Sequence, residues 1–347
     1  MTDLDRRVLL GVAGIAGIAA INRVARSGSL NPPPGAVSPT MKTLDEVEAR
    51  TPVQSLTGDS STLYIISQPG SYYLTGNVTG VSGQNAIAVT VANVSIDLNG
   101  FALIGVPGST NAIHASSTAN SLTVRNGAIS TWGGAGVDAG VANQVRIEGL
   151  MVDHCAAGGI HIGQRSFVRN CGVHLCSGFG ITTSNTCRVV ECIVDNTLAS
   201  GDGITCDYAS VIQDCSASEN AGSGLVTVGS GVLIFGCKAA FNTLDGVTIN
   251  STYAEVIDTV ATLNSANGIH STSGNGRIDH CSANRNSLIG ILVEMVGGGT
   301  TVTRCSSTSN FSNTDYSIAT GNKPAQVVSW GNAATGFASG DPVANIR

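Results

Sequence analysis

The fold is decided by residues 203–247, which read GITCDYASVIQDCSASENAGSGLVTVGSGVLIFGCKAAFNTLDGV. This stretch contains two copies of one pattern, in which a glycine and an apolar residue are followed by V/I-x-x-C-x-A and then by an asparagine. The cysteines of the two copies are Cys215 and Cys237, so the repeat is 22 residues long. Self-similarity at a short fixed period is the signature of a solenoid, in which each unit is stable only against its neighbours.

The pattern continues in both directions from this stretch. Its cysteine position is filled by Gly100, Gly127, Gly149, Cys171, Cys192, Cys215, Cys237, Thr259, Cys281 and Cys305, at spacings of 21 to 27 residues. Apolar residues alternate within each unit, which indicates β-strands. A unit of this length is too short for two helices but accommodates three short strands and three turns. We therefore predict an all-β fold, a parallel β-helix of about ten to eleven rungs, and the rule for parallel crossovers makes it right-handed.

Composition and charge agree with a β-solenoid and exclude several classes of protein. Glycine makes up 44 of the 347 residues, hydrophobic residues 42% and charged residues 12%, and the formal net charge is −6. A weakly charged, acidic chain argues against nucleic acid as a partner, because phosphate binding needs a basic stripe. No apolar run is long enough to span a bilayer, so no membrane span is expected after removal of the signal described next.

The N-terminus has the pattern of an export signal. Arg6 and Arg7 precede the apolar residues 8–21, which resemble a twin-arginine signal and its hydrophobic region. We predict an export signal over residues 1–27, a linker and N-terminal cap over 28–58, the β-helix over 59–331 and a C-terminal tail over 332–347. The T-x-x-E spacing from Thr43 to Glu46 predicts a short capping helix. Periplasmic, cell-surface and extracellular locations all remain open.

Two segments carry a resemblance to a known family. Residues 66–78 (ISQPGSYYLTGNV) and 94–101 (VSIDLNGF), preceded by residues 39–48 (PTMKTLDEVE), resemble secreted bacterial right-handed parallel β-helix repeat proteins of the pectate-lyase-like superfold. Members of that superfold include polysaccharide lyases, hydrolases, epimerases and non-catalytic surface proteins, so the resemblance implies the fold more than one function. The catalytic motifs of polygalacturonases are matched only by fragments in the wrong order, such as Gly201-Asp202-Gly203.

The cysteine spacing predicts a column of buried thiols rather than a disulfide framework. Cysteines that share one inward position on successive rungs are small apolar side chains, and we expect them to be reduced. Their Cα atoms would still lie within range for disulfides. Cys155 and Cys176 lie outside the column, 21 residues apart, and are the candidate disulfide.

A candidate site follows from the residue after each glycine–apolar pair, which points outward. His114, Asp138 and His161 occupy this position on three consecutive rungs, with a carboxylate between two imidazoles. Such a row suits acid–base catalysis or binding of a divalent metal. Candidate substrate-binding residues are Thr182 and Thr205, which continue the column, and Trp132, whose ring would present a flat face to a sugar. A solvated polar ladder without a function is the alternative.

The residue before each cysteine forms a second outward column. Glu191 and Asp214 are neighbouring carboxylates in this column and are candidate ligands for Ca²⁺. A charged edge in contact with solvent would give the same pattern.

Three functions remain open from the sequence. The favoured function is an exported protein that binds a polysaccharide or cell-surface glycan, and whether it also processes the glycan, as a lyase or hydrolase, is left open. The first alternative is a non-catalytic structural or adhesive module of the cell surface. The second is metal or copper handling in the periplasm, against which the absence of methionine clusters argues.

Overall fold

The computed structural model describes residues 50–325, 328–330 and 333–335. The predicted export signal and capping helix fall in residues 1–49, outside the described residues. Within the described residues the only helix is a single 3₁₀ turn, η1 (Val53–Ser55), and no helix is long and apolar enough to cross a membrane.

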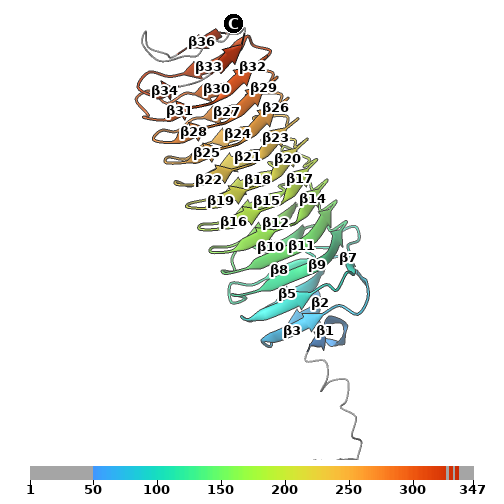
Figure 1. The fold of residues 1–347 in the computed structure, drawn as a ribbon. Helices are drawn as coiled ribbons and strands as arrows, with labels where there is room; N and C mark the ends of the chain where they lie inside the picture. The colour runs from blue at the N-terminus through green and yellow to red at the C-terminus, as the bar shows by residue number, and fades with distance from the viewer. Residues whose placement is uncertain (1–49, 326–327, 331–332, 336–347) are drawn as a thin grey trace, which may run out of the picture. The chain divides into compact units, whose positions relative to one another are not determined.

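All paired strands run parallel and form two sheets, which Figure 1 shows as a stack of rungs. One sheet has 13 strands: β2 (Thr62–Ile66), β5 (Asn85–Val89), β8 (Ile113–Ala115), β10 (Ala135–Ala139), β12 (Gly158–Ile162), β15 (Ile181–Thr183), β18 (Ile204–Cys206), β21 (Leu225–Thr227), β24 (Val247–Ile249), β27 (Ile269–Ser271), β30 (Ile291–Val293), β33 (Thr314–Ile318) and β36 (Ala333–Thr335). Each strand comes from one rung.

The other sheet has 23 strands in two ladders, which meet in the long strands β9 (Thr123–Ser130) and β11 (Arg146–Asp153). The first ladder also contains β1 (Thr51–Pro52), β3 (Gly70–Tyr73), β6 (Val94–Asp97), β13 (Phe167–Arg169), β16 (Arg188–Val190), β19 (Val211–Gln213), β22 (Leu233–Phe235), β25 (Glu255–Ile257), β28 (Arg277–Asp279), β31 (Thr301–Thr303) and β34 (Lys323–Ala325). The second ladder also contains β4 (Val78–Thr79), β7 (Ala102–Ile104), β14 (Gly172–His174), β17 (Ile193–Asp195), β20 (Ser216–Ser218), β23 (Lys238–Ala240), β26 (Val260–Thr262), β29 (Ser282–Asn284), β32 (Ser306–Thr308) and β35 (Val328–Trp330).

The predicted parallel β-helix is confirmed, but its length was underestimated. Thirteen strands in one sheet correspond to about twelve turns, against the ten to eleven expected. The first rung, which contains β2, lacks the cysteine pattern, so the repeat alone does not reveal it.

Each rung turns its corners on residues in the left-handed backbone conformation. Between the first and second ladders these are Asn99, Asn126, Gly149, Asn170, Glu191, Asp214, Gly236, Asp258, His280 and Arg304, with φ from +51° to +67°. We call this set the corner column. In β11 the left-handed residue is Gly149 itself, and Leu150 occupies the inward position that the sequence had assigned to Gly149.

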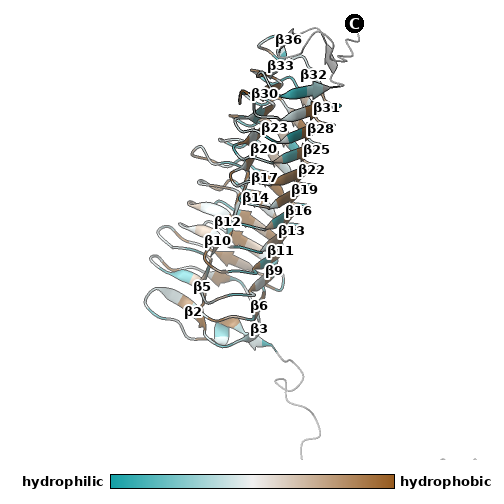
Figure 2. Ribbon diagram, turned by 90° about the vertical axis from the view of Figure 1, so that its left-hand side faces the viewer, coloured by the Kyte–Doolittle hydropathy of each residue, from teal (hydrophilic) through white to brown (hydrophobic). Residues whose placement is uncertain are grey.

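The inward positions form columns of one residue type. Middle residues of the first ladder, such as Val189, Ile212 and Ile234, are fully buried. A second buried column consists of Asn220, Asn242, Asn264, Asn286 and Asn310. In it each side-chain amide donates to the next asparagine at 2.9–3.1 Å. Figure 2 shows hydrophobic residues along the strands of both sheets. The core is therefore continuous through the stack, with a buried amide ladder at one edge.

The cysteine column is buried as predicted, and all ten cysteines are free thiols. Each Sγ of the column donates to the carbonyl two residues earlier, for example from Cys215 to Gln213 at 3.1 Å. The predicted disulfide is absent. Cys155 and Cys176 lie on neighbouring rungs, and their thiols donate to the carbonyls of Asp153 and His174 instead. Contact with the Cys176 thiol and burial raise the pKa of Cys155, so it is a poor thiolate nucleophile.

Candidate functional site

The outward column of the 13-stranded sheet follows the predicted register. Asp138 of β10 pairs with His114 of β8 on one side and with His161 of β12 on the other. Nδ1 of His114 lies 3.2 Å from Oδ2 of Asp138, and Nδ1 of His161 lies 3.3 Å from Oδ1. One carboxylate therefore holds both imidazole rings on consecutive rungs.

Electrostatics within this row favour the charged forms of Asp138 and His114. Hydrogen bonds from His114 and His161 hold the pKa of Asp138 well below its usual range. The hydrogen bond to Asp138 raises the pKa of His114 above its usual value, although partial burial acts in the opposite direction. The three side chains are 34–41% exposed. Among the described residues no partner contacts Nε2 of either ring, so both atoms are available to a ligand.

Glycines make room for two rings beside this row. A Cβ at Gly140 would lie 2.0 Å from the His161 ring, and a Cβ at Gly158 would lie 2.5 Å from the ring of Phe179. Phe179 stands edge-on to His161, with centroids 6.0 Å apart and an interplanar angle of 69°. An aromatic ring on a glycine floor thus borders the imidazole of His161. The sequence analysis missed Phe179, which lies in a connecting loop.

The prediction that Trp132 offers a face to a sugar is wrong. Its side chain is only 1% exposed, and its Nε1 donates to the carbonyl of Leu103 at 3.1 Å. The ring fills space left by Gly80, where a Cβ would lie 2.8 Å from it. Trp132 is therefore part of the core.

Thr182 and Thr205 continue the outward column beyond His161, as predicted, and both are partly exposed. Further along the same column, His270 forms a second cluster with Asp245, at 2.9 Å, and with Glu294, at 3.4 Å. The other oxygen of Asp245 accepts the backbone and side-chain N–H groups of Asn267. Since both oxygens of Asp245 are engaged and His270 is mostly buried, this cluster braces the sheet.

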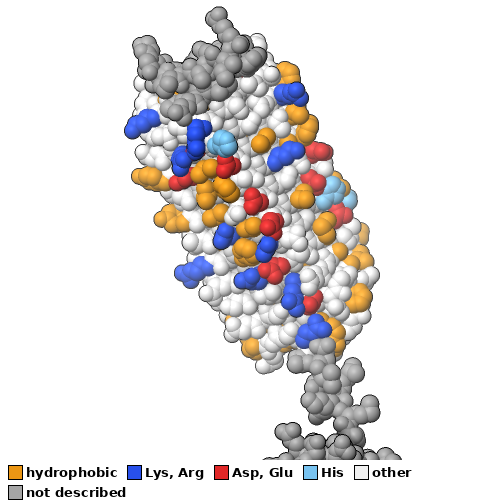
Figure 3. Space-filling model, viewed as in Figure 1, with side chains coloured by type: hydrophobic (Ala, Val, Ile, Leu, Met, Phe, Trp, Pro, Cys, Tyr) orange, Lys and Arg blue, Asp and Glu red, His pale blue; other side chains and the backbone are white. Residues whose placement is uncertain are grey.

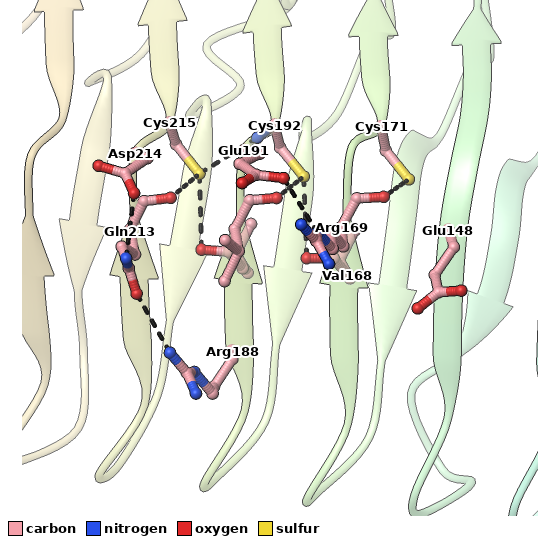
Figure 4. A network of polar contacts seen from close by, with 12 residues as sticks. Glu148, Val168, Arg169, Cys171, Arg188, Glu191, Cys192, Gln213, Asp214 and Cys215 are labelled. Carbon is pink, nitrogen blue, oxygen red and sulfur yellow. Dashed lines mark hydrogen bonds and ion pairs between the residues drawn. The ribbon is translucent and has the colours of Figure 1, made fainter.

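The predicted calcium pair lies in the corner column and is engaged by other side chains. Oε2 of Glu191 accepts from Nε of Arg169 at 3.0 Å, and Oδ2 of Asp214 accepts from the Gln213 amide at 3.0 Å (Figure 4). Arg169 thus supplies the positive charge that a cation would bring to Glu191. Over residues 50–325, 328–330 and 333–335, no group of three or more His, Cys, Asp or Glu side chains is arranged to hold a metal ion.

Comparisons with known proteins concern the fold. Residues 77–232 match the family model of the right-handed β-helix region, and no curated protein matches the sequence. The A-module of the mannuronan C-5 epimerase AlgE4 of Azotobacter vinelandii is similar in structure, with a TM-score of 0.53 and 14% identity over 80% of this chain and 91% of that chain. The Dettilon tailspike protein (gp208) gives 0.49, with 15% identity over 81% and 58%. Pectate lyase Pel9A gives 0.43, with 17% identity over 80% and 74%. The described chain is a right-handed parallel β-helix.

Proposed function

We propose that this protein binds an acidic polysaccharide on the outer face of the 13-stranded sheet, at the row His114–Asp138–His161. The observation that carries the proposal is the convergence of two partly exposed imidazoles on one carboxylate, with no described residue bonded to Nε2 of either ring. When both rings are protonated, their two positive charges exceed the single negative charge of Asp138. The row then attracts the carboxylate of an acidic sugar.

Phe179 completes the binding surface. Its ring lies on Gly158 beside His161 and is partly exposed, so it can pack against the C–H groups of a sugar ring. Thr182 and Thr205 add hydroxyl groups along the same column. A column that repeats at every rung suits a ligand that also repeats. The similar epimerase acts, by its name, on mannuronan, which supports a glycan as the ligand class.

The same row also has the parts for proton transfer. A neutral imidazole whose Nδ1 is held by Asp138 presents Nε2 as a base, and a protonated one is an acid. In a lyase reaction the base would remove the proton beside the sugar carboxylate, and the glycosidic oxygen would leave with the bonding electrons. In a hydrolase reaction one ring would take a proton from the water that attacks the anomeric carbon, and the other would protonate the glycosidic oxygen as its bond to that carbon breaks. Our proposal covers turnover of either kind.

An adhesive module without catalysis is the second candidate. Among the described residues no lysine or arginine contacts the row, and no metal cluster accompanies it, so only the imidazoles could neutralise a sugar carboxylate. A row with so few cationic and metal-binding groups is suited to binding a glycan without cleaving it.

Affinity electrophoresis in gels containing polygalacturonate or alginate tests binding. The wild type should be retarded, and more strongly at pH 5.5 than at pH 8, because His114 loses its charge as pH rises through its raised pKa. Phe179→Ala and His161→Gln should reduce the retardation, whereas His154→Asn, a histidine on the second-ladder side, should not. Equal mobility of all proteins with and without polymer would refute the proposal. Unsaturated products or new reducing ends would identify an enzyme, and binding without either would identify a module.

We also propose that residues 1–27 direct export. Replacement of Arg6 and Arg7 by lysine should leave the full-length chain inside the producing cell, whereas the wild type should be found outside the cytoplasm with a shortened N-terminus. N-terminal sequencing of the fractionated protein measures both, and an uncleaved wild type that stays in the cytoplasm would refute export.

A further inference from the structure

A groove runs over the second ladder, on a different side of each rung from the proposed polysaccharide site. One part has a volume of about 650 Å³ and is lined by residues from Glu191 to Val260. A second part of about 390 Å³ shares Glu191 and Ile193 with it and extends to Met151. Figure 3 shows a band of acidic, basic and imidazole side chains on this face, with hydrophobic side chains beside it. Neither part contains a residue of the His114 row.

The floor of the groove alternates between large and small residues. Along one outward column of the second ladder, successive rungs carry Met151, Gly172, Ile193, Ser216, Lys238 and Val260. Ser216 therefore forms a notch beside the exposed side chain of Ile193. The thioether of Met151 covers Gly172, where a Cβ would lie 2.6 Å from the Met151 sulfur.

The carboxylate of Asp214 borders the Ser216 notch on the side of the corner column. The carboxylate of Asp214 leans towards Gly236, where a Cβ would lie 2.5 Å from Oδ1 of Asp214. Asp214 has only the neutral Gln213 amide as a partner, and Lys238 forms no ion pair with any residue that the structure describes. These two groups can bond to a ligand without first breaking an ion pair.

The lining carries charges of both signs. Glu191 pairs with Arg169, Asp195 contacts His174, and Asp258 contacts His280. The carboxylate of Asp214 and the ammonium of Lys238 lie in the same groove. The carboxylates of Glu191, Asp214 and Asp258 disfavour an acidic chain, and the ammonium of Lys238 among them disfavours a basic one.

We propose that this groove binds an uncharged glycan chain that runs parallel to the solenoid axis. Apolar side chains at Met151, Ile193 and Val260 pack against C–H faces of the sugars, and Asp214 and Lys238 bond to hydroxyl groups. Mostly apolar walls with a few placed polar groups are the usual composition of a ligand site. This site is independent of the acidic-polysaccharide site proposed above.

Filling a notch tests the proposal. Ser216→Ile places a branched side chain between Ile193 and Lys238, and Ser282→Ile makes the same change in the same column on β29, outside the groove. Affinity electrophoresis with glucomannan and hydroxyethyl cellulose measures binding. We expect the wild type and Ser282→Ile to bind at least one of these polymers, and Ser216→Ile to bind it about tenfold more weakly or not at all.

Four results would overturn the proposal. They are no binding of the wild type to either uncharged polymer, equal binding by Ser216→Ile, equal loss in both isoleucine variants, and tighter binding of a basic peptide such as polylysine that Ser216→Ile abolishes. Phe179→Ala separates the two sites, since it should weaken binding of polygalacturonate and leave binding of the uncharged polymer unchanged. Loss of both ligands in Phe179→Ala would place the glycan on the 13-stranded sheet and also overturn the proposal.

Discussion

Single residues in the left-handed conformation set the corners of the solenoid. Asparagine, aspartate and glycine tolerate this conformation best, yet Glu191, His280 and Arg304 also adopt it in the corner column. For residues with a Cβ the left-handed region costs roughly 1–2 kcal/mol. The surrounding ladders therefore hold these residues in place, and glycine at such a position carries no such cost.

Gly236→Ala is expected to lower the free energy of unfolding by about 1–2 kcal/mol, because φ is +67° and the new Cβ would meet Oδ1 of Asp214. Gly76→Ala is the matched control, since its Cβ meets nothing within 4 Å. Thermal unfolding followed by circular dichroism compares the two. An unchanged midpoint for Gly236→Ala would contradict the strained corner.

The His114–Asp138 pair contributes to the stability of the fold over a defined pH range. The raised pKa of His114 makes its contribution to stability full below the ordinary pKa of histidine, and the contribution is lost as pH rises through the raised value. The lowered pKa of Asp138 makes its contribution full above the ordinary pKa of aspartate, and that contribution is lost in strong acid. NMR titration should therefore give a pKa above 6.5 for His114, and Asp138→Asn should lower it. Identical titration curves would exclude the pairing.

The sequence predicted the His114 row because strict alternation along a strand fixes which side chains point outward. The same reasoning failed where a residue lies outside a strand. Trp132 follows β9 in a turn, and the large ring turned inward into space left by glycines. Phe179 lies in a loop, and the repeat period of the strands does not determine the path of a loop. Gly149 has no side chain to indicate its direction, so its corner position was missed.

Among the structural elements, the buried asparagine ladder links five rungs through side-chain amides. Oδ1 of Asn264 accepts both the backbone N–H and the side-chain amide of Asn242, at 3.1 and 2.9 Å. Its own amide donates to Ala239 and Asn286. The repeat predicted the asparagines as turn and ladder amides, although Asn196 lies at a partly exposed corner outside the ladder.

Asn264→Ala should destabilise the solenoid by about 2–4 kcal/mol, because it leaves buried donors and an acceptor without partners. Asn250→Ala, which removes an exposed asparagine from the loop after β24, should change stability little. Denaturant titration of the two variants measures the difference. Equal stability would mean that the amide ladder contributes nothing net.

The cysteine column makes a second prediction for the folded state. With all ten thiols free and buried, an alkylating reagent should modify almost none of them in the native protein and all ten after denaturation, without a reductant. Intact-mass analysis counts the modified sites. Fewer than ten sites in the denatured, unreduced protein would reveal disulfides that the structure does not contain.

For the solenoid as a whole, stability is a sum of contacts between neighbouring rungs. Register matters more than the identity of any one rung, because a change of period displaces every inward column at once. This is why a short repeated pattern predicted the fold. The same pattern could not predict the irregular first rung or the ligands of the outer faces. The core repeats, whereas outward residues are free to differ from rung to rung.

Removal of one complete rung should leave a folded protein. Deletion of residues 238–259 joins Cys237 to Val260, which occupies the same ladder position as Lys238, so all later columns keep their register. Deletion of residues 238–248, half a rung, should abolish the fold. Circular dichroism and gel filtration distinguish the two outcomes, and equal behaviour of the deletions would contradict a repeat of this length.

The three bends of each rung also restrict which substitutions the chain tolerates. No valine or isoleucine stands at a positive-φ position in the part of the chain that the structure describes, although both are common in the strands between. A survey of all single replacements should therefore show two alternating patterns, in which inward positions do not tolerate polar residues and the bends do not tolerate branched aliphatic residues. Positions that follow neither pattern would be the surface positions at which the sequence can change to suit a ligand.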